Sequence, residues 1–174
     1  MLDAGREILW KLINSHESQG LISIRVIREI RVQNEIRMKT ILMAGGRGTR
    51  IAELFPNIPK PLIPVAGMPI LEREIRSLCA QGFKDIILTV GYLADKIIAY
   101  FGDGSQFGVK IDYFVEESPL GNAGALFRLR EKIGDEPFLL LNADAAFDVD
   151  FNRMVAFHQN HGGLVTLFTH PNSH

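Results

Sequence analysis

From Lys39 onward, short apolar runs alternate with segments that show the apolar spacing of amphipathic helices. Buried strands joined by helices are typical of a parallel sheet, because each crossover connection places a helix on one of its faces. The strands are predicted at residues 40–44, 85–90, 109–115, 137–141 and 164–169, and the helices at residues 70–80, 93–101, 123–133 and 151–160. The pattern predicts an α/β, Rossmann-like fold: a mostly parallel sheet with helices on both faces.

A glycine-rich loop follows the first predicted strand. Parallel sheets bind ligands outside the carboxyl ends of their strands, so we expect functional residues in the loops after Ala44, Val115 and Leu141. The first loop reads Gly45-Gly46-Arg47-Gly48-Thr49-Arg50, and Lys60 follows it. Glycines allow a sharp turn and bring backbone N–H groups close to phosphate oxygens, while the basic residues add positive charge. The segment is therefore interpreted as a polyphosphate-binding loop.

Two common phosphate-binding motifs do not describe this loop. No Gly-Lys-Ser/Thr sequence follows it, as the Walker pattern requires, and Ile51 stands where the dinucleotide fingerprint needs a third glycine. The loop and Lys60-Pro61 instead resemble the signature of the sugar-1-phosphate nucleotidylyltransferases, Gly-Gly-x-Gly-Thr-Arg followed by Lys-Pro. The resemblance covers about residues 38–150, through further motifs at 61–70, 116–126 and 142–144, and looks most like the mannose-1-phosphate and heptose-1-phosphate guanylyltransferases.

The family resemblance implies a reaction. An oxygen of a sugar 1-phosphate attacks the α-phosphate of a nucleoside triphosphate and releases pyrophosphate, with no covalent enzyme intermediate. Catalysis of this kind rests on positioning the reactants and neutralising their charge. We therefore expect a nucleoside triphosphate, with GTP favoured, a sugar 1-phosphate and Mg²⁺ as the bound molecules. Mg²⁺ is expected because the carboxylate of Asp144 follows a buried strand, where it can meet a magnesium ion that bridges phosphates.

The resemblance also implies a role for individual residues. The expected nucleotide-binding residues are Ala44, Gly45, Gly46, Arg47, Gly48, Thr49, Glu116, Gly121 and Asn122, and the expected catalytic residues are Arg50, Lys60 and Asp144, the last also as the metal ligand. The segment that begins at Glu116 matches the part of the family that recognises the base. A carboxylate can accept hydrogen bonds from the amino and ring N–H groups of guanine, which is why GTP is favoured.

Several residues depart from this pattern or have an alternative interpretation. Asn122 stands where many relatives have Thr, and Ala143 stands where most have Gly, which is expected to place a methyl group near the nucleotide's sugar or metal. Asp144 alone is also compatible with a turn or helix cap. Four further residues are interpreted as structural rather than metal-binding: His158 and His161 as cations at a helix end, and Asp148 and Asp150 as helix caps.

The two ends of the chain lie outside the family pattern. Residues 1–37 are expected to form an amino-terminal appendage, a helix and an extended segment, that nucleotide binding does not need; residues 38–174 are the nucleotide-binding part. Members of the resembled family continue beyond the position of His174 with a lysine that contacts the sugar phosphate and an aspartate that completes the metal site. We therefore expect a domain truncated at its carboxyl end, with little or no turnover on its own.

Composition excludes several classes of function. A net charge of −1 provides no basic field for a nucleic-acid backbone. Apolar runs such as 138–141 are far shorter than the ~20 residues of a membrane-spanning helix. A lone Cys79 and the absence of a secretory signal pattern indicate the cytoplasm.

Three alternatives remain open from the residues. The chain could be a non-catalytic nucleotide-binding or regulatory fragment that acts through a partner chain. Its appendage is compatible with a homo-oligomer or with such a partner. A molybdopterin-type nucleotidyltransferase would share the glycine-rich start, but it fits the spacing of Lys60-Pro61 and Pro119-Leu120-Gly121 less well.

Overall fold

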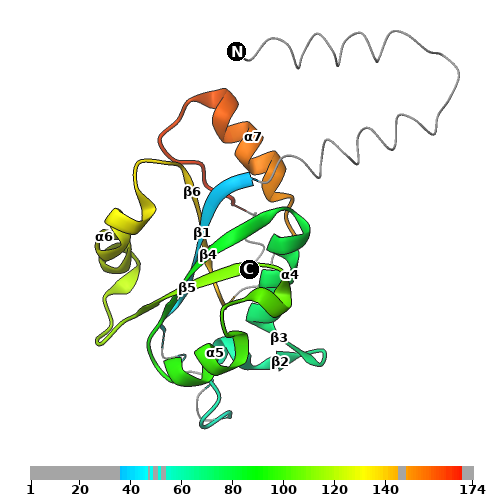
Figure 1. The fold of residues 1–174 in the computed structure, drawn as a ribbon, viewed down its shortest axis with the longest axis vertical. Helices are drawn as coiled ribbons and strands as arrows, with labels where there is room; N and C mark the ends of the chain where they lie inside the picture. The colour runs from blue at the N-terminus through cyan, green and yellow to red at the C-terminus, as the bar shows by residue number, and fades with distance from the viewer. Residues whose placement is uncertain (1–35, 47, 49–50, 52–53, 145–147, 170–174) are drawn as a thin grey trace, which may run out of the picture. The chain divides into compact units, whose positions relative to one another are not determined.

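The computed structural model describes residues 36–46, 48, 51, 54–144 and 148–169. Its centre is a four-stranded parallel sheet with the strand order β5-β4-β1-β6 (Figure 1). The strands are β1 (Ile36–Ala44), β4 (Phe83–Val90), β5 (Lys110–Val115) and β6 (Phe138–Asn142). The predicted α/β fold with a parallel sheet is confirmed. Residues 1–35 of the predicted appendage lie outside the described residues, whereas residues 36 and 37 belong to β1. The division of the chain into an appendage and a nucleotide-binding part stays a prediction.

The helices match their predicted positions to within two residues. They are α4 (Ile70–Ala80), α5 (Ala94–Phe101), α6 (Gly121–Ile133) and α7 (Phe151–His161). Two short 3-10 turns, η1 (Lys60–Leu62) and η2 (Ser105–Phe107), and a small hairpin of β2 (Pro64–Val65) and β3 (Met68–Pro69) complete the elements. Within the part of the chain that the structure describes, no helix is both long enough and apolar enough to cross a membrane.

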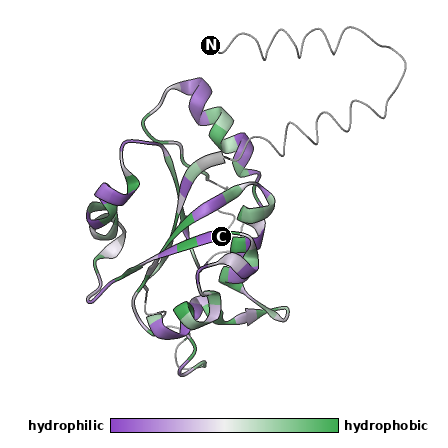
Figure 2. Cartoon of the chain, viewed as in Figure 1, coloured by the Kyte–Doolittle hydropathy of each residue, from purple (hydrophilic) through white to green (hydrophobic). Residues whose placement is uncertain are grey.

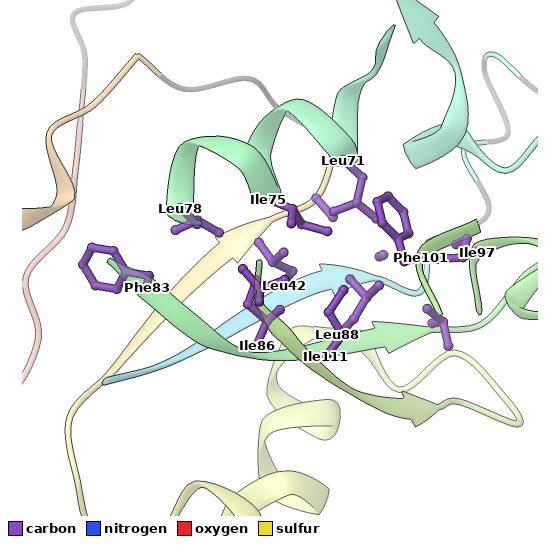
Figure 3. Packing of buried hydrophobic residues seen from close by; sticks show 14 of the residues in the cluster. Leu42, Leu71, Ile75, Leu78, Phe83, Ile86, Leu88, Ile97, Phe101 and Ile111 are labelled. Carbon is purple, nitrogen blue, oxygen red and sulfur yellow. The ribbon is translucent and has the colours of Figure 1, made fainter. Parts of the chain in front are cut away.

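The order of the strands explains where the helices lie. The chain moves outward from β1 to β4 and β5, then returns past β1 to form β6. Parallel crossovers are right-handed, so reversing direction moves the connecting helix to the opposite face of the sheet. Accordingly α4 packs on one face and α6 lies on the other (Figure 3). The loop after β1 therefore leads to α4 on one face and the loop after β5 leads to α6 on the other, and such a reversal point is where α/β sheets form ligand crevices.

Both faces of the sheet are covered by apolar side chains. Leu71, Ile75 and Leu78 of α4 are fully buried against one face, as their spacing predicts (Figure 3). On the other face, Ile41 and Ile87 pack with buried residues of α6. Along α6 and α7, Figure 2 shows hydrophilic residues interspersed with hydrophobic ones. Packing on both faces thus holds the sheet in place, including the carboxyl ends of its strands.

The strand predicted at residues 164–169 is wrong. These residues have no strand structure, and their large apolar side chains are exposed, with Leu164 fully so and Leu167 at 78%. A strand is stabilised by hydrogen bonds to a neighbouring strand, and the described sheet pairs no strand with this segment. Apolar composition alone therefore misled the prediction here.

The polar residues around α7 act at its two ends. Asp150 caps the helix, because its Oδ1 accepts a hydrogen bond from the backbone N–H of Arg153 at 3.1 Å. Its predicted capping role is confirmed, whereas no cap is formed by Asp148. At the other end, a ring nitrogen of His158 pairs with Thr166 Oγ1 at 2.9 Å and one of His161 lies 2.9 Å from the carbonyl oxygen of Phe157. Both histidines thus have partners in or beside the last helical turn.

A polar cluster joins α4 to α5. The buried carboxylate of Glu72 accepts hydrogen bonds from the Tyr100 hydroxyl at 2.5 Å and from Nε of Arg76 at 2.7 Å. The hydrogen bond from Tyr100, followed by Arg76, lowers the pKa of Glu72, and the same bond to Glu72 raises the pKa of Tyr100. The cluster is therefore built around an ionised Glu72 and a neutral Tyr100.

Replacing Tyr100 with phenylalanine is expected to lower the free energy of unfolding by about 1–2 kcal/mol at neutral pH, because the bond accepted by the Glu72 carboxylate is lost. The pKa of Glu72 is lower in the folded state than in the unfolded state, so its contribution to the free energy of unfolding is lost as the pH falls through the folded-state pKa. The pKa of Tyr100 is raised in the folded state, so its contribution to the free energy of unfolding is lost as the pH rises through its folded-state pKa. Urea unfolding across pH measures both effects. Tyr92→Phe, at an exposed tyrosine, is the control, and equal stability of the two variants at neutral pH would contradict the assignment.

Candidate active site

A cavity of about 770 Å³ opens at the carboxyl ends of β1, β5 and β6. Its volume lies in the range typical of small-molecule sites. The register of the sheet explains its position, because Ala44 pairs with Val90, Val90 with Val115, and Met43 with Asn142, so the strands end side by side. The lining residues are Met43, Ala44, Gly45, Gly46, Gly48, Ile51, Lys60, Pro61, Glu116, Pro119, Gly121, Asn142 and Asp144.

Two of the three described glycines of the loop after β1 are closely packed or strained. A Cβ on Gly45 would lie 3.0 Å from Cδ of Glu116 and still closer to its Oε1, so the Glu116 side chain would have to shift. Gly48 has a φ of +58°, which side-chain-bearing residues rarely adopt, and a Cβ there would lie 3.0 Å from Cβ of Lys60. Gly46 has open space around it. The loop therefore exposes backbone to the cavity, as a phosphate-binding loop must.

Lys60 and Asp144 form an ion pair at one wall of the cavity. Nζ of Lys60 lies 2.7 Å from Oδ2 of Asp144, and the two side chains are 32% and 46% exposed. The lysine begins η1, directly after Pro59 and before Pro61, whereas the aspartate follows β6. Both charged groups remain accessible to solvent, so a ligand in the cavity can reach either of them.

Glu116, directly after β5, forms hydrogen bonds to the end of β4 and to the residue before α6. Its backbone N–H donates to the carbonyl oxygen of Val90 at 2.8 Å, and its Oε2 accepts a hydrogen bond from the backbone N–H of Leu120 at 3.1 Å. Leu120 immediately precedes α6, whose first turn has no side-chain cap. The carboxylate thus lies between the glycine loop and the amino-terminal end of α6.

The structure gathers most of the candidate residues around this cavity. Those that line it are Ala44, Gly45, Gly46, Gly48, Lys60, Glu116, Gly121 and Asp144. Arg47, Thr49 and Arg50 lie outside the described residues, as does the side chain of Asn122. The functional roles of all these residues stay predictions.

Some lining residues were not among the candidates. They are Met43, Ile51, Pro61, Pro119 and Asn142. Each lies within two residues of a candidate, and three of them (Pro61, Pro119 and Asn142) belong to the family motifs, although no site role was expected for them. Gly91 was also missed: a Cβ on it would lie 2.9 Å from the carbonyl oxygen of Gly45. The sequence feature that could have identified Gly91 is its position directly after a buried strand, β4, which pairs with β1.

The expectation for Ala143 is wrong. Ala143 is fully buried in the hydrophobic core, and the cavity is lined instead by its neighbours Asn142 and Asp144. Ala143 follows the last residue of β6, and its backbone N–H donates a hydrogen bond to Met43 O at 3.1 Å. Its methyl group therefore packs in the core and does not line the cavity.

The site offers limited ligands for a metal ion. Asp144 contributes an accessible carboxylate, and across residues 36–46, 48, 51, 54–144 and 148–169 no three His, Cys, Asp or Glu side chains are grouped to hold a metal. Mg²⁺ commonly binds one or two carboxylates and completes its coordination with phosphate oxygens and water. The residues therefore fit a Mg²⁺ that is shared with a bound phosphate, rather than a metal held by protein ligands alone.

Comparison with known sequences identifies relatives over most of the described chain. Residues 39–174 match the family model described as nucleotidyl transferase. The mannose-1-phosphate guanyltransferase of Aspergillus oryzae is 40% identical over 134 residues, which cover 75% of this chain and 36% of that protein. The UTP–glucose-1-phosphate uridylyltransferase of Synechocystis sp. is 36% identical over 143 residues, which cover 76% of this chain and 37% of that protein. The chain thus spans little more than a third of the length of these relatives.

A solved structure agrees with the sequence comparison. HddC from Yersinia pseudotuberculosis, in a complex with GMP-PN, superposes with a TM-score of 0.63 and 31% sequence identity, over 70% of this chain and 54% of that one. The parallel sheet of this chain agrees with the structural similarity to HddC, and the family match covers residues 39–174. The chain therefore belongs to the nucleotidyl transferase family.

Proposed function

We propose that this chain forms the nucleotide-binding part of a sugar-1-phosphate nucleotidylyltransferase that uses GTP. The observation that carries the proposal is the Lys60–Asp144 ion pair, 2.7 Å long, on the wall of a cavity that a glycine loop also lines. A cation, a carboxylate and exposed loop backbone are the groups that a metal-bound triphosphate requires.

In the proposed reaction, a phosphate oxygen of the sugar 1-phosphate forms a bond to the α-phosphorus of GTP. The bond from that phosphorus to the oxygen that bridges to the β-phosphate breaks, and pyrophosphate leaves with the bonding electrons. The products are a nucleotide sugar and pyrophosphate. No side chain needs to become a nucleophile, so the chain's contribution is to position the phosphates and to neutralise their charge.

Lys60 and Asp144 would exchange partners when the triphosphate binds. In the structure each neutralises the other. An incoming phosphate group offers Lys60 a stronger partner, because it carries more negative charge than one carboxylate. The move of Nζ toward phosphate leaves Oδ2 of Asp144 free to accept a metal ion. Mg²⁺, when bound, would supply charge neutralisation at the phosphate oxygens.

Two observations support GTP over UTP. Among the relatives that match this chain are several guanyltransferases, and the structurally similar HddC was solved with GMP-PN. A relative from Synechocystis sp. is named for UTP, which makes uridylyl transfer the second candidate. Pro119 and Gly121 line the cavity at the amino-terminal end of α6, and we propose that the base lies there.

Calorimetric titration with GTP, UTP and ATP, each with and without Mg²⁺, tests this proposal. We expect GTP to bind with the highest affinity and Mg²⁺ to strengthen its binding. The variant Lys110→Ala is the control, because Lys110 forms a 2.9 Å ion pair with Asp112 on β5 and does not line the cavity. Binding of none of the three nucleotides at millimolar concentration would refute the proposal, and UTP binding more tightly than GTP would reassign the base.

A further inference from the structure

Two residues at the end of β4 contact the backbone where the glycine loop leaves the sheet. β4 pairs with β1, and Ala44, the last residue of β1, lies opposite Val90. Thr89 and Gly91, on either side of Val90, therefore lie beside the start of the loop. Neither of them is among the described residues that line the cavity, so any effect they have on a ligand acts through the residues they contact.

Thr89 contacts the end of β1 through its hydroxyl group. Its Oγ1 accepts a hydrogen bond from the backbone N–H of Ala44 at 3.3 Å and donates to Sδ of Met43 at 3.8 Å. Both of these partners line the cavity. Thr89 is fully buried, and a β-branched side chain has few rotamers, so the hydroxyl has a fixed position. Ala44 is buried as well, so its N–H depends on this acceptor.

Gly91 contacts the loop through main-chain atoms alone. A Cβ on Gly91 would lie 2.9 Å from the carbonyl oxygen of Gly45, 3.5 Å from its Cα and 3.6 Å from its carbonyl carbon. Main-chain atoms cannot rotate away as the end of a side chain can, and hydrogen bonds hold the chain on both sides of the contact. Met43 O accepts from Ala143 N at 3.1 Å, and Gly91 O accepts from Ala94 N at 3.1 Å. A side chain at position 91 would therefore displace the start of the loop.

From these contacts we propose that Thr89 and Gly91 are positioning residues for nucleotide binding, because they fix the backbone of Ala44 and Gly45. The inference rests on the proposed function, in which the glycine loop binds the phosphates. When the start of the loop shifts, only a fraction of the molecules has the loop in the binding arrangement, and the apparent affinity falls by that fraction. Nucleoside triphosphates share their phosphates, so the loss should be equal for different bases.

Substitutions of Thr89 test the contact with Ala44. Thr89→Val keeps the shape of the side chain but removes the acceptor, so it should weaken Mg²⁺–GTP and Mg²⁺–UTP by the same factor, about fivefold or more. Thr89→Ser restores the hydroxyl and should bind both to within about twofold of the wild type. The matched control is Thr40→Val, because Thr40 of β1 is also fully buried but its Oγ1 has no hydrogen-bond partner among the described residues. It should leave both affinities unchanged.

A substitution of Gly91 tests the contact with Gly45. Gly91→Ala places a methyl group against the Gly45 carbonyl and should weaken both nucleotides by about tenfold. The control is Gly163→Ala, because a Cβ there would lie 3.6 Å from the carbonyl oxygen of Val165, an ordinary contact distance, and Gly163 does not line the cavity. It should leave both affinities unchanged.

The experiment measures calorimetric affinities and thermal unfolding of the whole chain and of each variant. Wild-type affinities in folded Thr89→Val or Gly91→Ala, even with a lowered unfolding temperature, would show a merely structural role and overturn the inference. A loss confined to one nucleotide, or an equal loss in Thr40→Val, would overturn it as well. The Thr89 series decides alone if Gly91→Ala does not fold. These outcomes leave the proposed function intact, whereas failure of the wild-type chain to bind either nucleotide would reject both.

Discussion

Lys60→Ala should weaken the binding of Mg²⁺–GTP by about tenfold to a hundredfold, because a charge-assisted bond to phosphate contributes roughly 1.5–3 kcal/mol. The loss should be similar for Mg²⁺–UTP, since the lysine contacts phosphate and not the base in the proposed arrangement. Calorimetric titration gives both affinities. Removal of Nζ also leaves Asp144 without its 2.7 Å partner, so the variant should bind free Mg²⁺ or Mn²⁺ more tightly than the wild type.

The control for Lys60 is Lys110→Ala, which breaks an ion pair of similar length outside the cavity. It should leave both nucleotide affinities unchanged. Equal affinities for GTP in Lys60→Ala and the wild type would contradict the phosphate role. A loss of affinity in the Lys110 variant as large as that in the Lys60 variant would indicate a general charge effect instead.

Asp144→Asn should abolish the dependence of GTP binding on Mg²⁺. Asparagine keeps the shape of the side chain but removes the negative charge that a hard cation prefers. The affinity measured with Mg²⁺ should therefore fall to the value measured without it. The affinity for metal-free GTP should not fall, because Lys60 no longer has a competing carboxylate. Titrations with Mg²⁺ and with a chelator measure the two values.

The matched control for Asp144 is Asp112→Asn, which removes the carboxylate of the Lys110 pair on β5. It should preserve the wild-type response to Mg²⁺. An Asp144→Asn variant that remains folded and responds to Mg²⁺ like the wild type would show that the metal role is wrong. The alternative interpretation of Asp144 as a cap or turn residue would then be preferred.

The sheet and its helices were predictable because their signals are local. Buried parallel strands have apolar runs and amphipathic helices have apolar residues three or four apart, and the face of α4 with Leu71, Ile75 and Leu78 shows the agreement. Residues 164–169 have the same apolar character but no strand beside them in the described sheet. A strand depends on a partner elsewhere in the chain, and local composition does not report that partner.

The site was predictable in part. The loops that line the cavity could be located, since strand order places the carboxyl ends of parallel strands together and the glycines indicate close backbone approach. The pairing of Lys60 with Asp144 could not, because the two residues are separated by 84 positions and meet only through the reversal of the chain before β6. The burial of Ala143 was missed because it depends on where β6 ends, at Asn142.

The contacts of Glu116 show a further limit of sequence reasoning. A carboxylate after a strand is chemically able to bind guanine, and the motif alone does not indicate whether its oxygens are already in contact with other groups. The hydrogen bond from Leu120 and the contact with Gly45 supply that information. The neighbouring Gly91 acquires its meaning in the same way, since its approach to Gly45 is visible only in the assembled sheet.

A structure of this chain in a complex with Mg²⁺ and GTP tests the central claim most directly. We predict that the triphosphate lies along the loop of Gly45, Gly46 and Gly48, with Nζ of Lys60 within hydrogen-bond distance of a phosphate oxygen and no longer paired with Asp144. The Mg²⁺ should bridge Asp144 and the phosphates, and the base should lie near Gly121. A triphosphate bound elsewhere, or one bound in the cavity with the Lys60–Asp144 pair intact, would contradict the account.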